Sequence, residues 1–167
     1  MCIRDSVGAV AGFARAVRGE VVLDLYAGAG LFGGSLASAV GEEGRVVCVE
    51  ADPAACAAAD ANLADLPQAE VWQGDIDADG LAGLLADLGR PDVVVLDPPR
   101  AGAGAAVSRV LAAAGPRAIV YVACDPASLA RDVAVLAEAG YRMAGLRAYD
   151  AFPMTQHVEC VALLVPA

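Results

Sequence analysis

The chain has 167 residues, of which 58% are apolar, and its formal net charge is −10, from 21 acidic and 11 basic residues. This length suits one domain with a substantial core, and the apolar content excludes a disordered chain. The acidic balance excludes a broad basic face and, taken alone, opposes a nucleic-acid partner, because phosphate contacts usually need clustered basic residues.

The predicted elements alternate between helix and strand along the chain. A helix is expected over residues 7–17, where the apolar spacing suits packing on a sheet. The strands are expected at 21–25, 45–50, 69–73, 92–97, 117–123, 141–149 and 157–165, and the further helices at 31–40, 53–63, 81–88, 103–114 and 126–139. Five alternations with apolar strands predict a mostly parallel sheet with helices on both faces. Because no helix separates the last two strands, we expect an antiparallel C-terminal hairpin in a seven-stranded, Rossmann-like α/β fold.

The first 19 residues stand apart from this repeating pattern. Residues 1–6 (MCIRDS) fit none of the periodicity that follows, and we interpret them as a truncated or non-native start. We therefore expect a leading segment with one helix at 1–19, followed by a single domain at 20–167.

The five cysteines show no CxxC pair and no even framework. This usage is typical of a reduced, cytoplasmic protein without structural zinc or disulfides, so we expect no metal. The longest uncharged stretch, residues 25–41, is rich in glycine and follows a predicted strand. We therefore expect no membrane span, and we expect a monomer.

A glycine-rich turn follows the first predicted strand, where Gly28, Gly30 and Gly33 form a GxGxxG motif. Glu50 lies 20 residues beyond Gly30, at the end of the second strand, where an acid can bind a ribose. The pattern indicates a nucleoside ligand, and it fits a dinucleotide and an adenosyl cofactor equally. A tight turn with an incidental acid also stays open, because such short motifs recur by accident.

Two further acids favour the adenosyl cofactor. Asp24 is near the end of the first strand, where it would repel a pyrophosphate but attract the ammonium and sulfonium groups of S-adenosylmethionine. Asp75 follows the third strand and, near the adenine, would complete an acid-lined cleft with Asp24 and Glu50. Asp75 is equally typical of an ordinary turn.

Asp97, Pro98 and Pro99 follow the fourth predicted strand, at the sheet edge where open α/β folds bind ligands. The two prolines fix the backbone and can line a planar ring, while the Asp97 carboxylate can contact cofactor or substrate. A rigid turn with a solvated Arg100 is the structural alternative.

Cys124 ends the fifth predicted strand, directly before a helix that Asp125 and Pro126 begin. The helix dipole favours a thiolate there and Asp125 opposes it, so position alone makes Cys124 a candidate nucleophile. Glu159 lies near the start of the last strand and can face the same cleft. The alternatives are that Cys124 is a small apolar core residue and that Glu159 is an exposed edge-strand acid.

Together these motifs resemble the RNA uracil-5 methyltransferase family, whose members form 5-methyluridine in tRNA and rRNA. The matching motifs are DLYAGAGLFG at 24–33, VE at 49–50, DPPRAG at 97–102, YVACDPASLARD at 121–132 and FPMTQHVECVALL at 152–164. The resemblance implies a class I S-adenosylmethionine-dependent methyltransferase fold for residues 20–167. It also implies that Cys124 is the nucleophile and Glu159 the base, and that Tyr26, Glu50 and Asp97 contact the cofactor.

The reaction implied by the resemblance is methylation of carbon 5 of a uridine, through a covalent cysteine adduct at carbon 6. Family members carry an N-terminal RNA-binding β-barrel, and we expect this chain to be a fragment without it that needs that module to bind tRNA or rRNA. Two alternatives stay open. An NAD-type Rossmann oxidoreductase would leave the DPPR, ACDP and HVE motifs unused, and an inactive domain would only bind S-adenosylmethionine.

Overall fold

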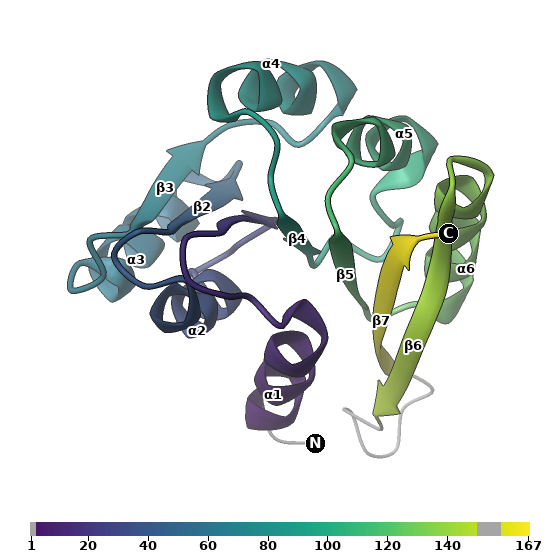
Figure 1. Ribbon diagram of the computed structural model, residues 1–167, viewed down its shortest axis with the longest axis horizontal. Coiled ribbons are helices and arrows are strands. Elements are labelled where there is room, and N and C mark those ends of the chain that lie inside the picture. Colours follow the sequence, from purple (N-terminus) through teal and green to yellow (C-terminus); the bar gives the residue numbers. More distant parts are fainter. Residues whose placement is uncertain (1–2, 150–157) are drawn as a thin grey trace.

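The computed structural model describes residues 3–149 and 158–167, which form one seven-stranded sheet with helices on both faces (Figure 1). The helices are α1 (Ile3–Ala14), α2 (Leu31–Val40), α3 (Pro53–Leu63), α4 (Ala78–Leu88), α5 (Gly104–Ala114) and α6 (Pro126–Glu138). The strands are β1 (Val21–Leu25), β2 (Arg45–Glu50), β3 (Ala69–Gln73), β4 (Val93–Leu96), β5 (Ala118–Ala123), β6 (Tyr141–Tyr149) and β7 (Glu159–Pro166).

The strand order is β3-β2-β1-β4-β5-β7-β6. Strands β1 to β5 pair in parallel, and β7 runs antiparallel to both β5 and β6. The mostly parallel sheet and the antiparallel C-terminal hairpin are therefore confirmed. The chain order reverses between β1 and β4, and such a reversal creates the crevice in which open α/β sheets bind ligands.

Aspartate caps begin three of the helices. Asp52 and Asp125 cap α3 and α6 as predicted, and a proline follows each of them. The Asp52 side chain accepts the N–H groups of Ala54 and Ala55, and that of Asp125 accepts the N–H of Ser128. The helix predicted from Leu81 begins earlier, at Ala78, because Asp77 caps it. That cap lies outside the apolar pattern from which the helix was predicted.

Helix α1 differs from its prediction at both ends. It begins at Ile3, four residues before the predicted start at residue 7, so residues 3–6 are helical. It ends at Ala14 because Arg15 adopts a φ of 42°, which a right-handed helix cannot continue. The interpretation of the first six residues as a non-native start stays a prediction.

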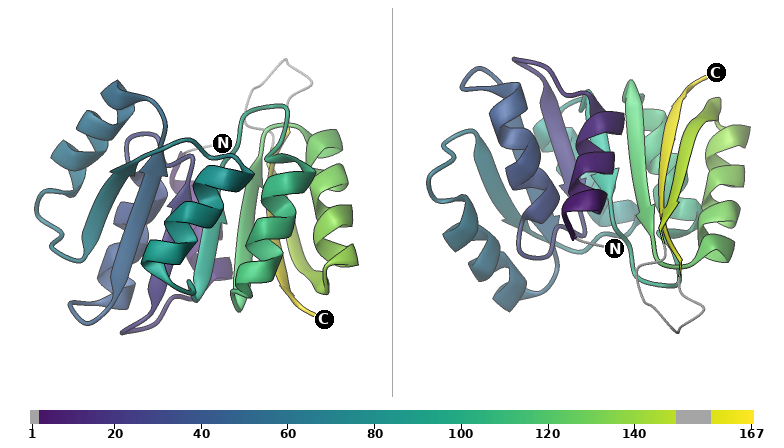
Figure 2. Two further views of the ribbon diagram at one scale, coloured as in Figure 1. Left: turned by 90° about the horizontal axis from the view of Figure 1, so that it is seen from above. Right: turned by 90° about the horizontal axis from the view of Figure 1, so that it is seen from below.

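Helices α1, α2 and α3 cover one face of the sheet, and α4, α5 and α6 cover the other (Figure 2). An apolar core lies between the sheet and each of these two groups of helices. Successive residues of a strand point to opposite faces. In β1, Val22 therefore belongs to the first core, while Leu23 and Leu25 belong to the second. The same alternation places Asp24 on the face that α2 covers.

Helix α2 approaches the sheet closely at Gly33. A Cβ atom at this position would collide with Cys48 Sγ and would lie 3.1 Å from Asp24 Oδ2 and 3.3 Å from Val46 Cγ1. The Gly33 N–H donates to Asp24 Oδ2 at 2.7 Å. The third glycine of the GxGxxG motif therefore allows the helix and the strands to meet.

We expect Gly33→Ala to lower the free energy of unfolding by about 1–3 kcal/mol, because the added methyl group overpacks the contact of α2 with β1 and β2. Gly83→Ala is the matched control, since Gly83 lies inside α4 and nothing comes within 4 Å of its Cβ position. Helix propensity alone should make this control more stable, by up to about 1 kcal/mol. Urea denaturation measures the free energy of unfolding of both variants. A Gly33→Ala variant that is more stable than the wild type would contradict the close approach of α2 to the sheet.

Candidate functional site

The predicted site residues gather at the carboxyl edge of the parallel strands. Glu50 ends β2, Asp97 follows β4 and Cys124 follows β5. Glu159 begins β7, which pairs with β5 and so returns to the same edge. The reversal between β1 and β4 lies among them, so the fold brings these residues to the place where a ligand crevice is expected.

Glu50 is fixed by backbone donors of the glycine loop and of its own strand end. Its Oε2 accepts the N–H of Gly28 at 2.9 Å, and its Oε1 accepts those of Ala51 at 2.8 Å and Asp52 at 3.0 Å. Gly28 and Gly30 take left-handed φ values of 54° and 81°, which explains why the loop needs glycine there. The loop and the acid are thus preformed as one unit.

Asp24 lies beneath the glycine loop and is fully buried, so it does not line an open cleft as expected. Its Oδ2 accepts the Gly33 N–H, while its Oδ1 has no hydrogen-bond partner among the described residues. Burial raises the pKa of Asp24 to about 7 against the opposing effect of the Gly33 N–H, and the nearby charge of Asp97 adds to the rise. A direct role in cofactor binding stays a prediction.

Tyr26 connects the loop after β1 to the loop after β3. Its backbone adopts a φ of 58°, which is rare for a residue with a Cβ atom and recurs at functional sites. Its hydroxyl donates to the carbonyl oxygen of Ile76 at 3.3 Å. Asp75 precedes Ile76 and is exposed, so the structure brings Tyr26 and the Asp75 loop together at the crevice.

Asp97 is anchored to the sheet and partly buried. Its N–H donates to the carbonyl oxygen of Leu25 in β1 at 3.2 Å. Burial raises the pKa of the Asp97 carboxyl to about 6, and the negative charge of Glu159 contributes to the rise. Pro98 is buried and Pro99 is exposed, and their role in lining a ring stays a prediction.

Cys124 and Glu159 lie at the same end of the β5–β7 antiparallel ladder. The β5–β7 ladder pairs Val122 with Val161 and ends with Ala123 opposite Cys160, so the next positions outward are Cys124 and Glu159. Cys124 comes directly after the last residue of β5, and Glu159 comes directly before Cys160 in β7, so both lie near the carboxyl edge of the parallel strands. Both side chains are half-buried, and burial raises the pKa of Glu159.

The sequence prediction missed a role for Asp132, although it lies within the quoted YVACDPASLARD motif. Asp132 is buried in α6 between Leu129 and Leu136, which are also buried. These three residues follow helical spacing, so they share the face that packs on the sheet. A carboxylate within an apolar helix face is the signal that would have singled it out.

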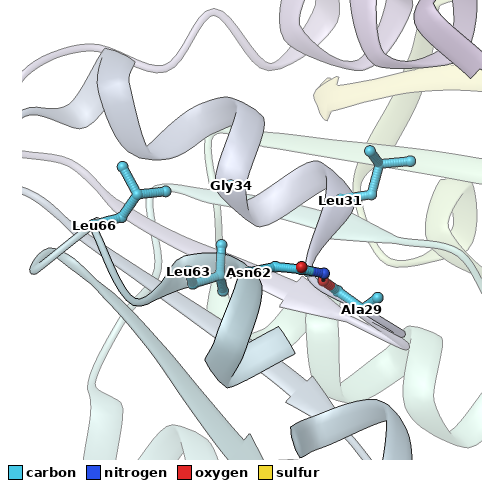
Figure 3. A pocket seen from close by; sticks show the side chains of 7 residues that line it. Ala29, Leu31, Gly34, Asn62, Leu63 and Leu66 are labelled. Atoms are coloured by element: carbon cyan, nitrogen blue, oxygen red, sulfur yellow. Dashed lines mark hydrogen bonds between the residues drawn. The ribbon is translucent and has the colours of Figure 1, made fainter. Parts of the chain in front are cut away.

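A pocket of about 690 Å³ lies between the glycine loop and the helices that follow it (Figure 3). It is lined by Ala29, Gly30, Leu31, Gly34, Asn62, Leu63 and Leu66. The Asn62 side-chain amide donates to the carbonyl oxygen of Ala29 at 3.0 Å and so connects α3 to the loop. The lining of this pocket is mainly apolar, and Gly30 is the one predicted site residue among the residues that line it.

The described part of the chain was compared with the requirements of a metal site and of a membrane-spanning helix. Within residues 3–149 and 158–167, no three His, Cys, Asp or Glu side chains group as a metal site would require. No helix in these ranges is long and apolar enough to cross a bilayer. The only histidine, His157, and the start of the FPMTQHVECVALL motif lie outside the described residues.

Comparisons with known sequences point to one family. The family model described as tRNA (Uracil-5-)-methyltransferase matches residues 12–166. An uncharacterized RNA methyltransferase of Streptomyces avermitilis is 47% identical over 152 residues, which cover 90% of this chain and 34% of that protein. Another, of Thermotoga maritima, is 42% identical over 148 residues, covering 87% of this chain and 32% of that protein. The chain thus spans about a third of the length of these curated relatives.

Solved structures share the fold. The tRNA (uracil-54, C5)-methyltransferase of Pyrococcus abyssi, in complex with S-adenosyl-L-homocysteine, has a TM-score of 0.75 at 33% identity, covering 96% of this chain and 38% of that one. An S-adenosylmethionine-dependent O-methyltransferase of Thermotoga maritima has a TM-score of 0.77 at 18% identity, covering 100% of this chain and 66% of that one. The fold is therefore that of class I methyltransferases, and the chain belongs to the tRNA (uracil-5-)-methyltransferase family.

Proposed function

We propose that this chain methylates carbon 5 of a uridine in tRNA or rRNA, with S-adenosylmethionine as the methyl donor and Cys124 as a covalent nucleophile. The observation that supports the proposal is the β5–β7 register, whose last pair is Ala123 with Cys160, so that Cys124 and Glu159 each lie one residue beyond it. Family membership and the name of the Pyrococcus abyssi neighbour support the reaction and the substrate class. Because the net charge of the chain is −10, RNA binding would rest on a separate N-terminal module of the enzyme.

The residues of the crevice fit S-adenosylmethionine. Asp24 Oδ1 is buried beneath the glycine loop without a partner among the described residues, so its carboxyl group would favour a nearby ammonium group through its charge without contacting open solvent. Glu50 uses three of about four carboxylate acceptor positions on backbone N–H groups, which leaves one for a ribose hydroxyl. Tyr26, Asp75 and Asp97 complete the proposed set. When bound, S-adenosylmethionine supplies the methyl group.

Cys124 would provide the activation that uracil needs. Carbon 5 of uracil is a poor nucleophile, and addition of a thiolate to carbon 6 places electron density on carbon 5 as an enolate. The Sγ–C6 bond forms before carbon 5 is methylated and breaks afterwards. A uracil within folded RNA must first turn out of its stack to reach Cys124.

Glu159 would remove the carbon-5 proton after methylation. Partial burial raises the pKa of Glu159, and a raised pKa brings a carboxylate closer to the strength that a general base needs near neutral pH. The electron pair of the C5–H bond re-forms the C5–C6 double bond as the Sγ–C6 bond breaks. Cys124 leaves as a thiolate, and Glu159 retains the proton until solvent removes it.

We expect Glu50→Gln to weaken binding of S-adenosyl-L-homocysteine by about 10- to 100-fold, because charge-assisted hydrogen bonds contribute about 1.5–3 kcal/mol each. Glu70→Gln is the matched control, since Glu70 pairs with Arg45 on a partly exposed surface of β2 and β3. Isothermal titration calorimetry measures both dissociation constants. A Glu50→Gln variant that binds as tightly as the wild type would remove Glu50 from the cofactor site.

Nucleoside analysis tests the proposed reaction directly. The chain is incubated with tRNA or rRNA transcripts and methyl-labelled S-adenosylmethionine, and the RNA is digested to nucleosides. Label in 5-methyluridine supports the proposal, whereas label in another nucleoside contradicts it. A parallel titration with NAD distinguishes the proposed methyltransferase from the oxidoreductase alternative. The alternative requires that NAD binds and that S-adenosyl-L-homocysteine does not bind.

The acidic balance favours a second candidate, a domain that binds S-adenosylmethionine without acting on RNA unaided. Filter binding to tRNA and rRNA over a salt series distinguishes it, because RNA affinity that rests on phosphate contacts falls steeply with salt. Tight cofactor binding without RNA retention or transfer would select this second candidate.

A further inference from the structure

We propose that Asp132, acting with Tyr121, is a positioning residue that fixes residues 99–104 against the strand and the helix that flank Cys124. The Asp132 Oδ2 atom accepts three hydrogen bonds, from Ala103 N at 2.8 Å, Gly104 N at 3.1 Å and the Tyr121 hydroxyl at 2.5 Å. Asp132 is 4% exposed and Tyr121 is fully buried. A buried carboxylate is costly unless it is well paired, and the three donors to Oδ2 come from the loop, from the start of α5 and from β5.

The loop approaches Asp132 so closely that only glycine fits at position 102. Gly102 adopts a φ of 83°, and a Cβ atom there would lie 2.6 Å from Asp132 Oδ2 and 3.2 Å from Ser128 Cβ. The Ala103 N–H is shared between Asp132 and the Tyr121 hydroxyl, 2.9 Å away. Burial and the bond to Asp132 both raise the pKa of Tyr121, so its hydroxyl remains a donor to the carboxylate.

The clamp formed by Asp132 and Tyr121 joins the segments on either side of the proposed nucleophile. Tyr121 lies in β5, which leads to Cys124, and Asp132 lies in α6, which begins two residues after Cys124. The loop they hold follows Pro98 and Pro99. Asp97, by contrast, is held independently by its N–H bond to β1. Burial and the charge of Asp132 raise the pKa of Tyr26 in the proposed cofactor set, so Tyr26 stays a neutral hydroxyl with or without that charge. The clamp should therefore control the substrate side of the crevice and leave cofactor affinity unchanged.

A merely structural role makes a different prediction. Asp132 also satisfies the first N–H groups of α5, as a capping residue from another helix would. If capping were its whole contribution, its loss would lower stability without separating cofactor binding from chemistry. The inference rests on the proposed function, so the experiment includes one readout that does not depend on catalysis.

The test compares Asp132→Asn and Tyr121→Phe with the wild-type chain. Ser108→Ala is the matched control, because Ser108 is 1% exposed in α5 and its Oγ has no partner among the described residues. Amide hydrogen exchange at Ala103 and Gly104 reports the clamp itself. Calorimetry gives the dissociation constant of S-adenosyl-L-homocysteine, and RNA containing 5-fluorouridine gives the maximal rate of covalent adduct formation at saturation.

Both clamp variants should exchange these two amides faster, bind S-adenosyl-L-homocysteine as the wild type does, and form the adduct up to about 100-fold more slowly, as for a misplaced reacting group. Tyr121→Phe keeps the ring packing and covers the case in which Asp132→Asn does not fold. Unchanged hydrogen exchange at Ala103 and Gly104 in both variants would show that the clamp does not hold the loop. An unchanged rate of adduct formation would overturn the positioning role. Parallel losses of cofactor affinity and of adduct rate would overturn it as well. Absence of an adduct in the wild type would refute the proposed function and with it the positioning role. Hydrogen exchange at Ala103 and Gly104 would then still show whether Asp132 and Tyr121 hold the loop.

Discussion

Cys124→Ala is expected to abolish methyl transfer to uridine, with a loss of about 10⁴-fold or more, as when the nucleophile of a covalent mechanism is removed. Without the thiolate, carbon 5 of uracil stays a poor nucleophile, however well the cofactor is bound. S-adenosyl-L-homocysteine should bind this variant with unchanged affinity, because Cys124 is not in the proposed cofactor set. Transfer is measured as labelled 5-methyluridine, and the adduct as a protein–RNA band that survives denaturing electrophoresis with 5-fluorouridine RNA.

Cys160→Ala is the matched control for this variant. Cys160 is the neighbouring thiol in the same ladder, 5% exposed and paired with Ala123. Its replacement should leave the adduct and the transfer rate unchanged and cost about 1 kcal/mol of stability through the small cavity. A covalent adduct that persists in Cys124→Ala would refute the assignment of the nucleophile.

Glu159→Gln should trap the enzyme on its product. The Sγ–C6 bond still forms and carbon 5 is still methylated, but the amide cannot take the carbon-5 proton, so elimination should slow by about 10²- to 10⁴-fold, the usual contribution of a general base. Ordinary RNA should then accumulate as a stable protein adduct after a single burst of methylation. Rapid-quench kinetics measures the burst, and denaturing electrophoresis measures the trapped complex.

The pH dependence gives this prediction a second check. Because burial raises the pKa of Glu159, the wild type should lose its release rate as the pH falls through that raised value and the carboxylate becomes protonated. This fall in the release rate at low pH should be absent from Glu159→Gln. It should be present in the control Glu138→Gln, because Glu138 is exposed at the end of α6. Wild-type turnover by Glu159→Gln would exclude Glu159 as the base.

Much of the fold could be predicted because its signals are local. The strands at 45–50 and 69–73 have the bounds expected from their short β-type runs, and Asp52 and Asp125 begin helices where their capping chemistry indicates. Prediction failed where the deciding feature was a cap outside the periodic segment, as at Asp77 before α4, or a single backbone angle, as at Arg15 after α1.

The site was predictable as a list of residues at strand ends, but not in its contacts. The alternation in β1 does not reveal that α2 closes over Asp24, because that depends on how closely Gly33 lets the helix approach. The placement of Cys124 and Glu159 at one end of the same ladder depends on the register of two strands far apart in the sequence. The role of Asp132 needs the loop and the helix together, since its partners lie 11 to 29 residues away.

The most direct test of the mechanism is the position of the covalent bond. The chain is incubated with S-adenosylmethionine and RNA containing 5-fluorouridine, digested with trypsin and nuclease, and sequenced by tandem mass spectrometry. Cleavage after Arg117 and Arg131 releases a peptide in which Cys124 is the only cysteine. The proposed mechanism predicts a methylated fluorouridine nucleotide on Cys124 of this peptide. A nucleotide on any other residue, or no adduct while ordinary RNA still gains 5-methyluridine, would contradict it.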